Sequence, residues 1–286
     1  MKKAAIDIGS NSIRMLIGEV KENNVVALEQ HLRTTRLGKT EKGGCLNKDA
    51  VTRTILALGE FKEILKNHNL ADKPIVAATS AVREAADKED FRQLIKKDLD
   101  WDLQILSGEE EAERSYLGAS SIVKEKAAVI DVGGGSTELI FADCGQVYGQ
   151  SVPVGAVRLH SGEVKNADLG QVLEPLKALY KKSAEPLVLV GVGGTITSLA
   201  AMKNNLKTYT REAVNGTIIT RADLENFYAE ITSMNGAEIL QKYPLLKNRE
   251  DIIGDGISIY LELFKLIDCD KITVSDAGIL DGLLIK

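Results

Sequence analysis

The chain has 286 residues, enough for a sizeable core and more naturally two domains than one. Hydrophobic residues make up 44% and charged residues 27%, the balance of an ordinary globular protein. The net charge of −5 argues against a nucleic-acid partner, because phosphate contacts along nucleic acid need clustered lysine and arginine.

Cysteine usage and hydropathy indicate the compartment. The three cysteines, Cys45, Cys144 and Cys269, are scattered and show no CxxC spacing, which disfavours a disulfide framework or a zinc site. The residues before Asp7 are too few and too polar for a secretory signal. No run reaches the roughly 18 apolar residues of a membrane span. We therefore expect a soluble cytoplasmic protein with no membrane association.

Strand and helix patterns alternate along the first half of the chain. Strands are expected at 4–8, 12–20 and 25–34, and a helix with Asn47 as its N-cap follows. The segment KPIVAATSAVREA reads as a buried strand that leads into a helix at about Ser80. A strand at 103–106 precedes a helix that begins near Ser107.

The second half repeats this alternation. Strands are expected at 127–131, 136–142 and 146–153, and PLVLVGVGGTITSLAAM reads as strand, glycine turn and helix. Thr220 and Asp223 have the spacing of a helix N-cap, 252–267 is helical in pattern, and KITVSDAGILDGLLI gives a last strand and helix. The class is therefore α/β with mixed sheets.

An internal repeat joins the two halves. IDIGSNS begins at Ile6 and IDVGGGS begins at Ile130, an offset of 124 residues that keeps aspartate, glycine and serine in register. Both copies follow an apolar strand pattern, so two structurally related halves are the better interpretation. We place the domains at 1–121 and 122–286, with the last helix as a candidate to pack back on the first domain.

Both repeated turns carry features of a phosphate site. Glycine lets backbone N–H groups approach a ligand closely, and successive N–H groups in a turn form a concave anion site. Short hydroxyl and amide side chains add donors. Beyond each turn, the period of two puts Arg14 on the face of Ser12 and Glu138 on the face of Ser136. The predicted phosphate-binding residues here are Gly9, Ser10, Asn11, Ser12, Arg14, Gly133, Gly134, Gly135, Ser136 and Thr137.

Asp7 and Asp131 end the two repeated strands. Hard oxygen ligands beside a phosphate site suit Mg²⁺, which keeps several waters and takes one or two carboxylates. The alternative is that both segments are merely tight turns. The presence of two copies in the same register disfavours this alternative.

A third glycine turn, GVGGT, follows an apolar strand and opens a helix, so Gly193, Gly194 and Thr195 are further candidates for binding an anion. The turn lacks the third glycine of a dinucleotide fingerprint, and the chain has no P-loop motif. Close packing of helix on strand is the alternative explanation.

The segment LSGEEEAERSYLG holds the most interesting carboxylates. Ser107 and Glu110 have the spacing of a capping box. Helix initiation explains Glu111 less well, so it is the candidate to deprotonate a water, and a solvated helix face is the alternative. Arg83, near the start of a helix, suits bidentate contact with phosphate. Arg36 and Arg158 are weaker candidates for the same role.

Seven motifs together resemble the exopolyphosphatase/guanosine pentaphosphate phosphohydrolase (Ppx/GppA) family. The resemblance runs from Ala4 to about Leu284. The motifs follow in this order: IDIGSNSIRMLI, TRLG, ATSAVREA, ILSGEEEAERSYLG, VIDVGGGSTELI, VPVGAVRL and VGVGGTITSLAA. The resemblance implies two ribonuclease-H-like lobes of the actin/hexokinase/heat-shock ATPase superfamily with a cleft between them.

The resemblance also implies Mg²⁺-dependent release of orthophosphate from inorganic polyphosphate or from the 5′-γ position of guanosine pentaphosphate. It makes Glu111 the general base and places Asp131 and Glu138 around the metal and the attacking water. It also implies that Arg83 and the Gly133–Thr137 loop bind phosphate. Whether a monovalent cation such as K⁺ takes part, and whether the protein forms a homodimer, stay open. The preferred substrate, its length and processivity are not determined by the sequence.

Two departures from the family pattern stand out. Leu280 occupies a position where the family often has an arginine, so any phosphate contact from there is lost. Longer members carry an additional C-terminal helical region that this sequence lacks, which puts processivity on long chains in question. A kinase or ATPase of the same fold and a non-catalytic guanosine tetra- or pentaphosphate-binding protein are the rival hypotheses.

Overall fold

The computed structural model describes residues 1–10, 12–21, 24–37, 44–70 and 74–286, and its contacts divide the chain into two compact units. Unit 1 comprises residues 1–118 and 278–286, and unit 2 comprises residues 119–277. The expected second domain, 122–286, therefore differs from unit 2 at its end, because the last helix packs on the sheet of unit 1.

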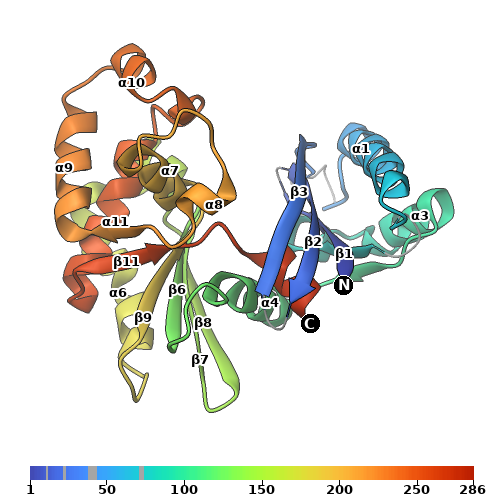
Figure 1. Ribbon diagram of the computed structural model, residues 1–286, viewed down its shortest axis with the longest axis horizontal. Coiled ribbons are helices and arrows are strands. Elements are labelled where there is room, and N and C mark those ends of the chain that lie inside the picture. Colours follow the sequence, from blue (N-terminus) through green and yellow to red (C-terminus); the bar gives the residue numbers. More distant parts are fainter. Residues whose placement is uncertain (11, 22–23, 38–43, 71–73) are drawn as a thin grey trace. The chain divides into compact units, whose positions relative to one another are not determined.

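Unit 1 is built on a five-stranded sheet with the strand order β3-β2-β1-β4-β5 (Figure 1). The first three strands form an antiparallel meander, and β4 and β5 continue parallel to β1. The strands are β1 (Lys2–Ile8), β2 (Ser12–Lys21), β3 (Asn24–Thr34), β4 (Ile75–Ala78) and β5 (Leu103–Ile105). The helices are α1 (Lys48–Asn67), α2 (Ser80–Arg83), α3 (Lys88–Leu99), α4 (Gly108–Ser120) and α12 (Ile279–Ile285).

The two faces of this sheet bury different side chains. Met15 belongs to a core that includes Phe61 of α1, whereas the next residue, Leu16, packs with Leu284 of α12. This alternation is the period of two expected for a strand covered on both faces. The red C-terminal helix lies beside the blue strands β1 and β2 (Figure 1). Leu280 is buried in the same α12 core, so an arginine there would place a guanidinium among apolar groups.

Unit 2 is built on a six-stranded sheet with the order β10-β11-β9-β6-β7-β8. Its strands are β6 (Ala127–Val132), β7 (Thr137–Asp143), β8 (Gln146–Val152), β9 (Val188–Val192), β10 (Ile218–Thr220) and β11 (Lys271–Val274). Its α-helices are α5 (Ala156–His160), α6 (Leu169–Tyr180), α7 (Gly194–Lys203), α8 (Arg211–Val214), α9 (Arg221–Thr232), α10 (Gly236–Lys242) and α11 (Ile253–Ile267).

The two sheets share one topology, which confirms the internal repeat. The order β8-β7-β6-β9-β11 in unit 2 reproduces β3-β2-β1-β4-β5 in unit 1. The registers correspond as well, because Asp7 lies opposite Arg14 and Asp131 lies opposite Glu138. Each turn is closed by a hydrogen bond from its first glycine to the serine carbonyl three residues later, 3.1 Å in unit 1 and 3.0 Å in unit 2.

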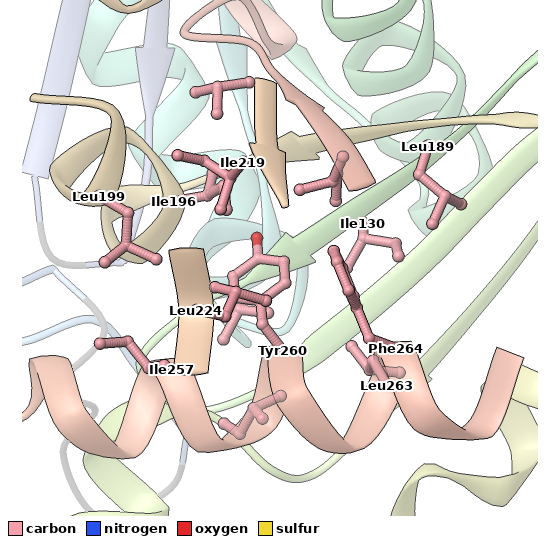
Figure 2. Close-up of a cluster of buried hydrophobic side chains, with 14 of the residues drawn as sticks. Ile130, Leu189, Ile196, Leu199, Ile219, Leu224, Ile257, Tyr260, Leu263 and Phe264 are labelled. Carbon is pink, nitrogen blue, oxygen red and sulfur yellow. The ribbon is translucent and has the colours of Figure 1, made fainter. Parts of the chain in front are cut away.

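Helix α11 supplies much of the core of unit 2. Figure 2 shows Ile257, Tyr260, Leu263 and Phe264 projecting from this helix toward Ile130 and other residues of the sheet. The hydroxyl of Tyr260, although fully buried, is satisfied because it donates to the carbonyl of Val192 at 3.3 Å. Burial, and secondarily the negative charge of Asp131, raise the pKa of Tyr260 well above its usual value. This hydrogen bond connects the end of β9 to α11.

Local capping signals begin several helices where the sequence predicts. The side chain of Asn47 accepts a hydrogen bond from the N–H of Ala50 at the start of α1. Thr220 and Asp223 form a reciprocal capping box at the start of α9. None of the helices in the described part of the chain has both the length and the apolar character needed to cross a bilayer.

Candidate active site

The turn of residues 133–136 in unit 2 presents backbone donors outward. Helix α5 holds the turn from one side, since Ala156 N–H donates to the Gly133 carbonyl and Val157 N–H to the Gly134 carbonyl, both at 2.9 Å. In a trans peptide the carbonyl and the next N–H point in opposite directions. The N–H groups of Gly134 and Gly135 therefore point away from α5. Both glycines are exposed, and neither N–H donates to another group in the described residues.

The contact between α5 and the turn depends on glycine at position 155. A Cβ at Gly155 would lie 2.6 Å from the carbonyl oxygens of Gly133 and Gly134, closer than real Cβ atoms come. The same helix brings Arg158 to the turn, with its Nε 3.8 Å from the position of a Cβ at Gly135. Arg158, only a weak candidate from sequence, is thus beside the predicted phosphate loop.

Two acids flank the turn. Asp131 and Glu138 are directly opposite one another in the β6–β7 ladder, so their side chains start from the same face of the sheet. Glu138 Oε1 accepts a hydrogen bond of 2.7 Å from the hydroxyl of Ser151 on β8, which orients the carboxylate. Asp131 and Glu138 are therefore brought together as predicted.

The third glycine turn lies next to Asp131. Gly193 has φ +90°, a left-handed conformation that favours glycine, and a Cβ there would collide with Asp131 Oδ1. A Cβ at Gly194 would overlap the guanidinium of Arg249, so this arginine lies against the start of α7. Arg249 is exposed and has no ion pair in the described part of the chain. Sequence reasoning missed Arg249, because nothing local marks this loop arginine.

The two threonines among the predicted phosphate-binding residues have buried side chains. Thr137 is fully buried, and its hydroxyl donates to the Val154 carbonyl at 2.6 Å. Strand periodicity turns it away from the face of Ser136 and Glu138. Thr195 is also buried and packs against Gly256 of α11. The Thr137 hydroxyl therefore does not face phosphate, which corrects that assignment. Thr195 was predicted as part of the N-terminus of α7, and that stays a prediction.

The equivalent turn of unit 1 is electrostatically different. Asp7 is buried and its Oδ2 accepts hydrogen bonds from Arg14, at 2.7 Å from Nη2 and 3.2 Å from Nε. Asp7 Oδ1 is buried without a hydrogen-bond partner in the described residues. Gly9 begins the turn, the Ser10 hydroxyl lies 3.1 Å from that of Ser80, and Ser12 opens β2. Asn11 lies outside the described residues.

The carboxylates differ in their suitability for Mg²⁺. The described residues contain no group of three or more His, Cys, Asp and Glu side chains able to hold a metal. Mg²⁺ needs only one or two carboxylates besides water and substrate oxygens, and the facing pair Asp131 and Glu138 fits that donor set. Asp7 is less suited, because the guanidinium of Arg14 already neutralises it.

Glu111 and Arg83 form an ion pair within unit 1. Arg83 Nη1 donates to Glu111 Oε2 at 2.8 Å and to the Leu106 carbonyl at 3.0 Å, and both side chains are about one-third exposed. Arg83 Nε and Nη2 make no hydrogen bond to the described residues. Glu110 is instead a capping residue that accepts from Ser107 N–H at 2.9 Å, a bond that holds its pKa below the usual value. Of these neighbouring glutamates, Glu111 is the one paired with an arginine.

Comparison with known proteins decides the family. The pattern of the Ppx/GppA phosphatase family matches residues 15–286. The chain belongs to this family. The predicted family and the predicted class of enzyme, a phosphoanhydride hydrolase, are thereby confirmed.

Two named relatives of this Ppx/GppA chain bear on its substrate. It is 29% identical to Exopolyphosphatase 2 of Mycobacterium tuberculosis over 99% of the chain and 97% of the relative. It is 27% identical to a guanosine-5'-triphosphate,3'-diphosphate pyrophosphatase of Aeromonas salmonicida over 98% of the chain but 58% of the relative. The family thus includes proteins named for both substrates in the sequence-based prediction.

Solved structures agree with the fold. The crystal structure of the Aquifex aeolicus Ppx/GppA family member superposes with a TM-score of 0.85 at 28% identity, covering 100% of this chain and 96% of that one. An exopolyphosphatase from Cytophaga hutchinsonii, at 24% identity and a TM-score of 0.79, has the same fold. The predicted class of two α/β lobes, each built on its own mixed sheet, is confirmed.

Proposed function

We propose that this chain is an exopolyphosphatase-type hydrolase that releases orthophosphate from the end of a phosphoanhydride chain. Inorganic polyphosphate is the first substrate to consider, and the 5′-γ phosphate of guanosine pentaphosphate is the second. The relative named for polyphosphate is matched over 97% of its length, whereas the pyrophosphatase is matched over 58%.

The observation that carries this proposal is the turn of residues 133–136 with its two flanking acids. Outward N–H groups at Gly134 and Gly135 provide preorganised donors for phosphate oxygens. Asp131 and Glu138 would repel the same phosphate unless a cation lies between them. A polyanion site that keeps two facing carboxylates favours metal-assisted chemistry over simple binding.

We assign the role of general base to Glu111. An ionised carboxylate accepts the proton of a water as that water attacks the terminal phosphorus. Arg83 holds one oxygen of Glu111 through Nη1, and its Nε and Nη2 are suited to phosphate oxygens. The guanidinium of Arg83 could thus contact the general base, Glu111, and a bound phosphate at the same time.

We assign the metal-binding role to Asp131 and Glu138. When bound, Mg²⁺ would supply positive charge against the phosphoryl oxygens. Ser151 keeps Glu138 Oε1 occupied, so that Oε2 is the oxygen suited to a metal or a water. Arg249 on Gly194 adds a fixed cation for the phosphate chain without a competing carboxylate in the described residues.

Orthophosphate release from tripolyphosphate, long polyphosphate and guanosine pentaphosphate tests this proposal, with Mg²⁺ and in parallel with EDTA. We expect Mg²⁺-dependent release from at least one phosphoanhydride and none from ATP above the level of a buffer control. Repeating the assay in K⁺ and in Na⁺ tests the predicted monovalent cation. Release from ATP alone, or transfer of its phosphate to an acceptor, would instead favour the kinase or ATPase alternative.

A further inference from the structure

Arg158 occupies a distinctive place beside the phosphate turn. It is on α5, the helix whose N–H groups hold the carbonyls of Gly133 and Gly134, and its Nε lies 3.8 Å from the position of a Cβ at Gly135. The arginine therefore lies beside Gly135, one of the two glycines whose N–H groups point away from α5.

The guanidinium of Arg158 is held only loosely by the protein. Its contacts are a long hydrogen bond of 3.5 Å from Nη1 to the Pro153 carbonyl and an approach of 3.7 Å from Nε to Glu163 Oε2. The side chain is 44% exposed. A phosphate group could therefore gain a strong, charge-assisted pair of hydrogen bonds from Arg158 at the expense of weak contacts.

Glu163 is placed to compete with such a phosphate. Its other oxygen, Oε1, accepts a hydrogen bond of 3.2 Å from the Ser161 hydroxyl, so the carboxylate is kept near Arg158. In the absence of an anion, Glu163 partly neutralises the arginine. A more highly charged phosphate displaces this carboxylate, because it presents more acceptor oxygens to the guanidinium.

Arg158 and Glu138 offer a bound anhydride two different chemical environments, a guanidinium and a carboxylate. Glu138 is three residues beyond Gly135, so the two residues are at most about 10 Å apart and one bound chain of phosphates can reach both. Asp131 and Glu138 are anionic and need a cation to approach phosphate, whereas Arg158 and the glycine N–H groups bind phosphate directly. A chain of several phosphates can span both environments, but orthophosphate cannot.

We infer that Arg158, together with the N–H groups of Gly134 and Gly135, forms a second phosphate subsite that holds a phosphate other than the one released. This inference rests on the proposed function, because it specifies which part of that substrate binds here. It makes affinity depend on the number of linked phosphates. Chain-length preference would then be set partly by Arg158.

Calorimetric titration in a Glu111→Gln background, where turnover should be about 10²- to 10⁴-fold slower, tests the subsite. With Mg²⁺ present, Arg158→Gln should raise the Kd for tripolyphosphate about tenfold and change the Kd for orthophosphate less than about twofold. Arg158→Lys should restore part of the lost affinity, since lysine keeps the positive charge but not the paired N–H donors of the guanidinium. Glu163→Gln should tighten tripolyphosphate binding, because it removes the competing carboxylate.

Arg33→Gln is the matched control, because Arg33 on β3 is 42% exposed and pairs with Glu60. It should leave both dissociation constants unchanged. Equal losses for tripolyphosphate and orthophosphate, or no loss with Arg158→Gln, would overturn the inference. Failure of wild-type protein to hydrolyse any anhydride would reject the proposed function instead, while the binding difference would still be measurable.

Discussion

Arg83 Nη1 lies 2.8 Å from Glu111 Oε2 and, through the same nitrogen, 3.0 Å from the Leu106 carbonyl. The carboxylate at the start of α4 is therefore held by a side chain that follows β4, in the same unit. This contact fixes one oxygen of Glu111 and the position of a guanidinium with two further nitrogens.

The first prediction concerns Glu111. Glu111→Gln keeps the size of the side chain and an oxygen that can accept from Arg83, but it cannot take a proton from water. We expect kcat for orthophosphate release to fall about 10²- to 10⁴-fold, with little change in thermal stability. Glu109→Gln, on the exposed start of the same helix, should retain activity near that of the wild type.

The second prediction concerns metal dependence. Asp131→Asn should raise the Mg²⁺ concentration for half-maximal activity by about tenfold or more, because one of two facing carboxylates loses its charge. Asp7→Asn should shift this concentration much less, since Arg14 already neutralises Asp7. Mg²⁺ titrations of both variants decide this, and a larger shift for Asp7→Asn would reverse the assignment of the metal site.

The third prediction concerns the orientation of Glu138. Ser151→Ala removes the 2.7 Å hydrogen bond to Glu138 Oε1, so the carboxylate is free to rotate. We expect about a tenfold loss of kcat with a small change in KM. Ser183→Ala removes a hydroxyl that donates to the Glu185 carbonyl in a loop before β9 and serves as the control. Wild-type kcat in Ser151→Ala would show that Glu138 needs no positioning.

The fourth prediction concerns the glycine that joins α5 to the phosphate turn. Gly155→Ala places a methyl group against the carbonyls of Gly133 and Gly134, so the turn must move. We expect a loss of about 1–3 kcal/mol in the free energy of unfolding, together with a loss of phosphate affinity. Gly59→Ala is the matched substitution in an open position of α1, and it should stabilise the protein by about 0.5–1 kcal/mol. Chemical denaturation of both variants measures the contrast.

The fifth prediction concerns acid stability. Glu29 accepts hydrogen bonds from His31 at 2.6 Å and from His68 at 2.8 Å, and the hydrogen bond from His31 is the largest cause that lowers the pKa of Glu29. A depressed carboxylate pKa stabilises the fold above the ordinary value of 4.5, and this stability is lost as the pH falls through the lower, folded-state value.

Melting temperature measured from pH 6 to pH 3 tests this, and Glu29→Gln should flatten the acid side of the curve. Glu225→Gln, on the exposed face of α9, should leave the curve as it is in the wild type. An acid limb that is identical in Glu29→Gln would mean that this histidine–glutamate cluster contributes nothing to the pH dependence.

Much of the fold could be predicted because its signals are local. Asn47 and the Ser107–Glu110 spacing cap helices through groups only three residues apart, and the structure contains both caps. The repeated turns can also be recognised in the sequence, because Asp7 and Asp131 occur in the same register before glycine. Strand pairing then follows from the meander that each turn begins.

The features that escaped prediction depend on distant parts of the chain. Arg249 reaches Gly194 only because the loop before α11 folds over the start of α7, and no spacing in the sequence records this. Thr137 has the composition of a phosphate loop, yet strand periodicity turns it inward. The packing of helix α12 on unit 1, where Leu284 covers a face of β1 and β2, was by contrast among the sequence-based expectations.

Initial rates of orthophosphate release from tripolyphosphate with Mg²⁺, compared between wild type and Glu111→Gln, test the central claim most directly. We predict steady release by the wild-type protein and a loss of at least about a hundredfold in the variant at unchanged melting temperature. Equal rates in the two proteins would contradict the assignment of Glu111 as the group that activates water.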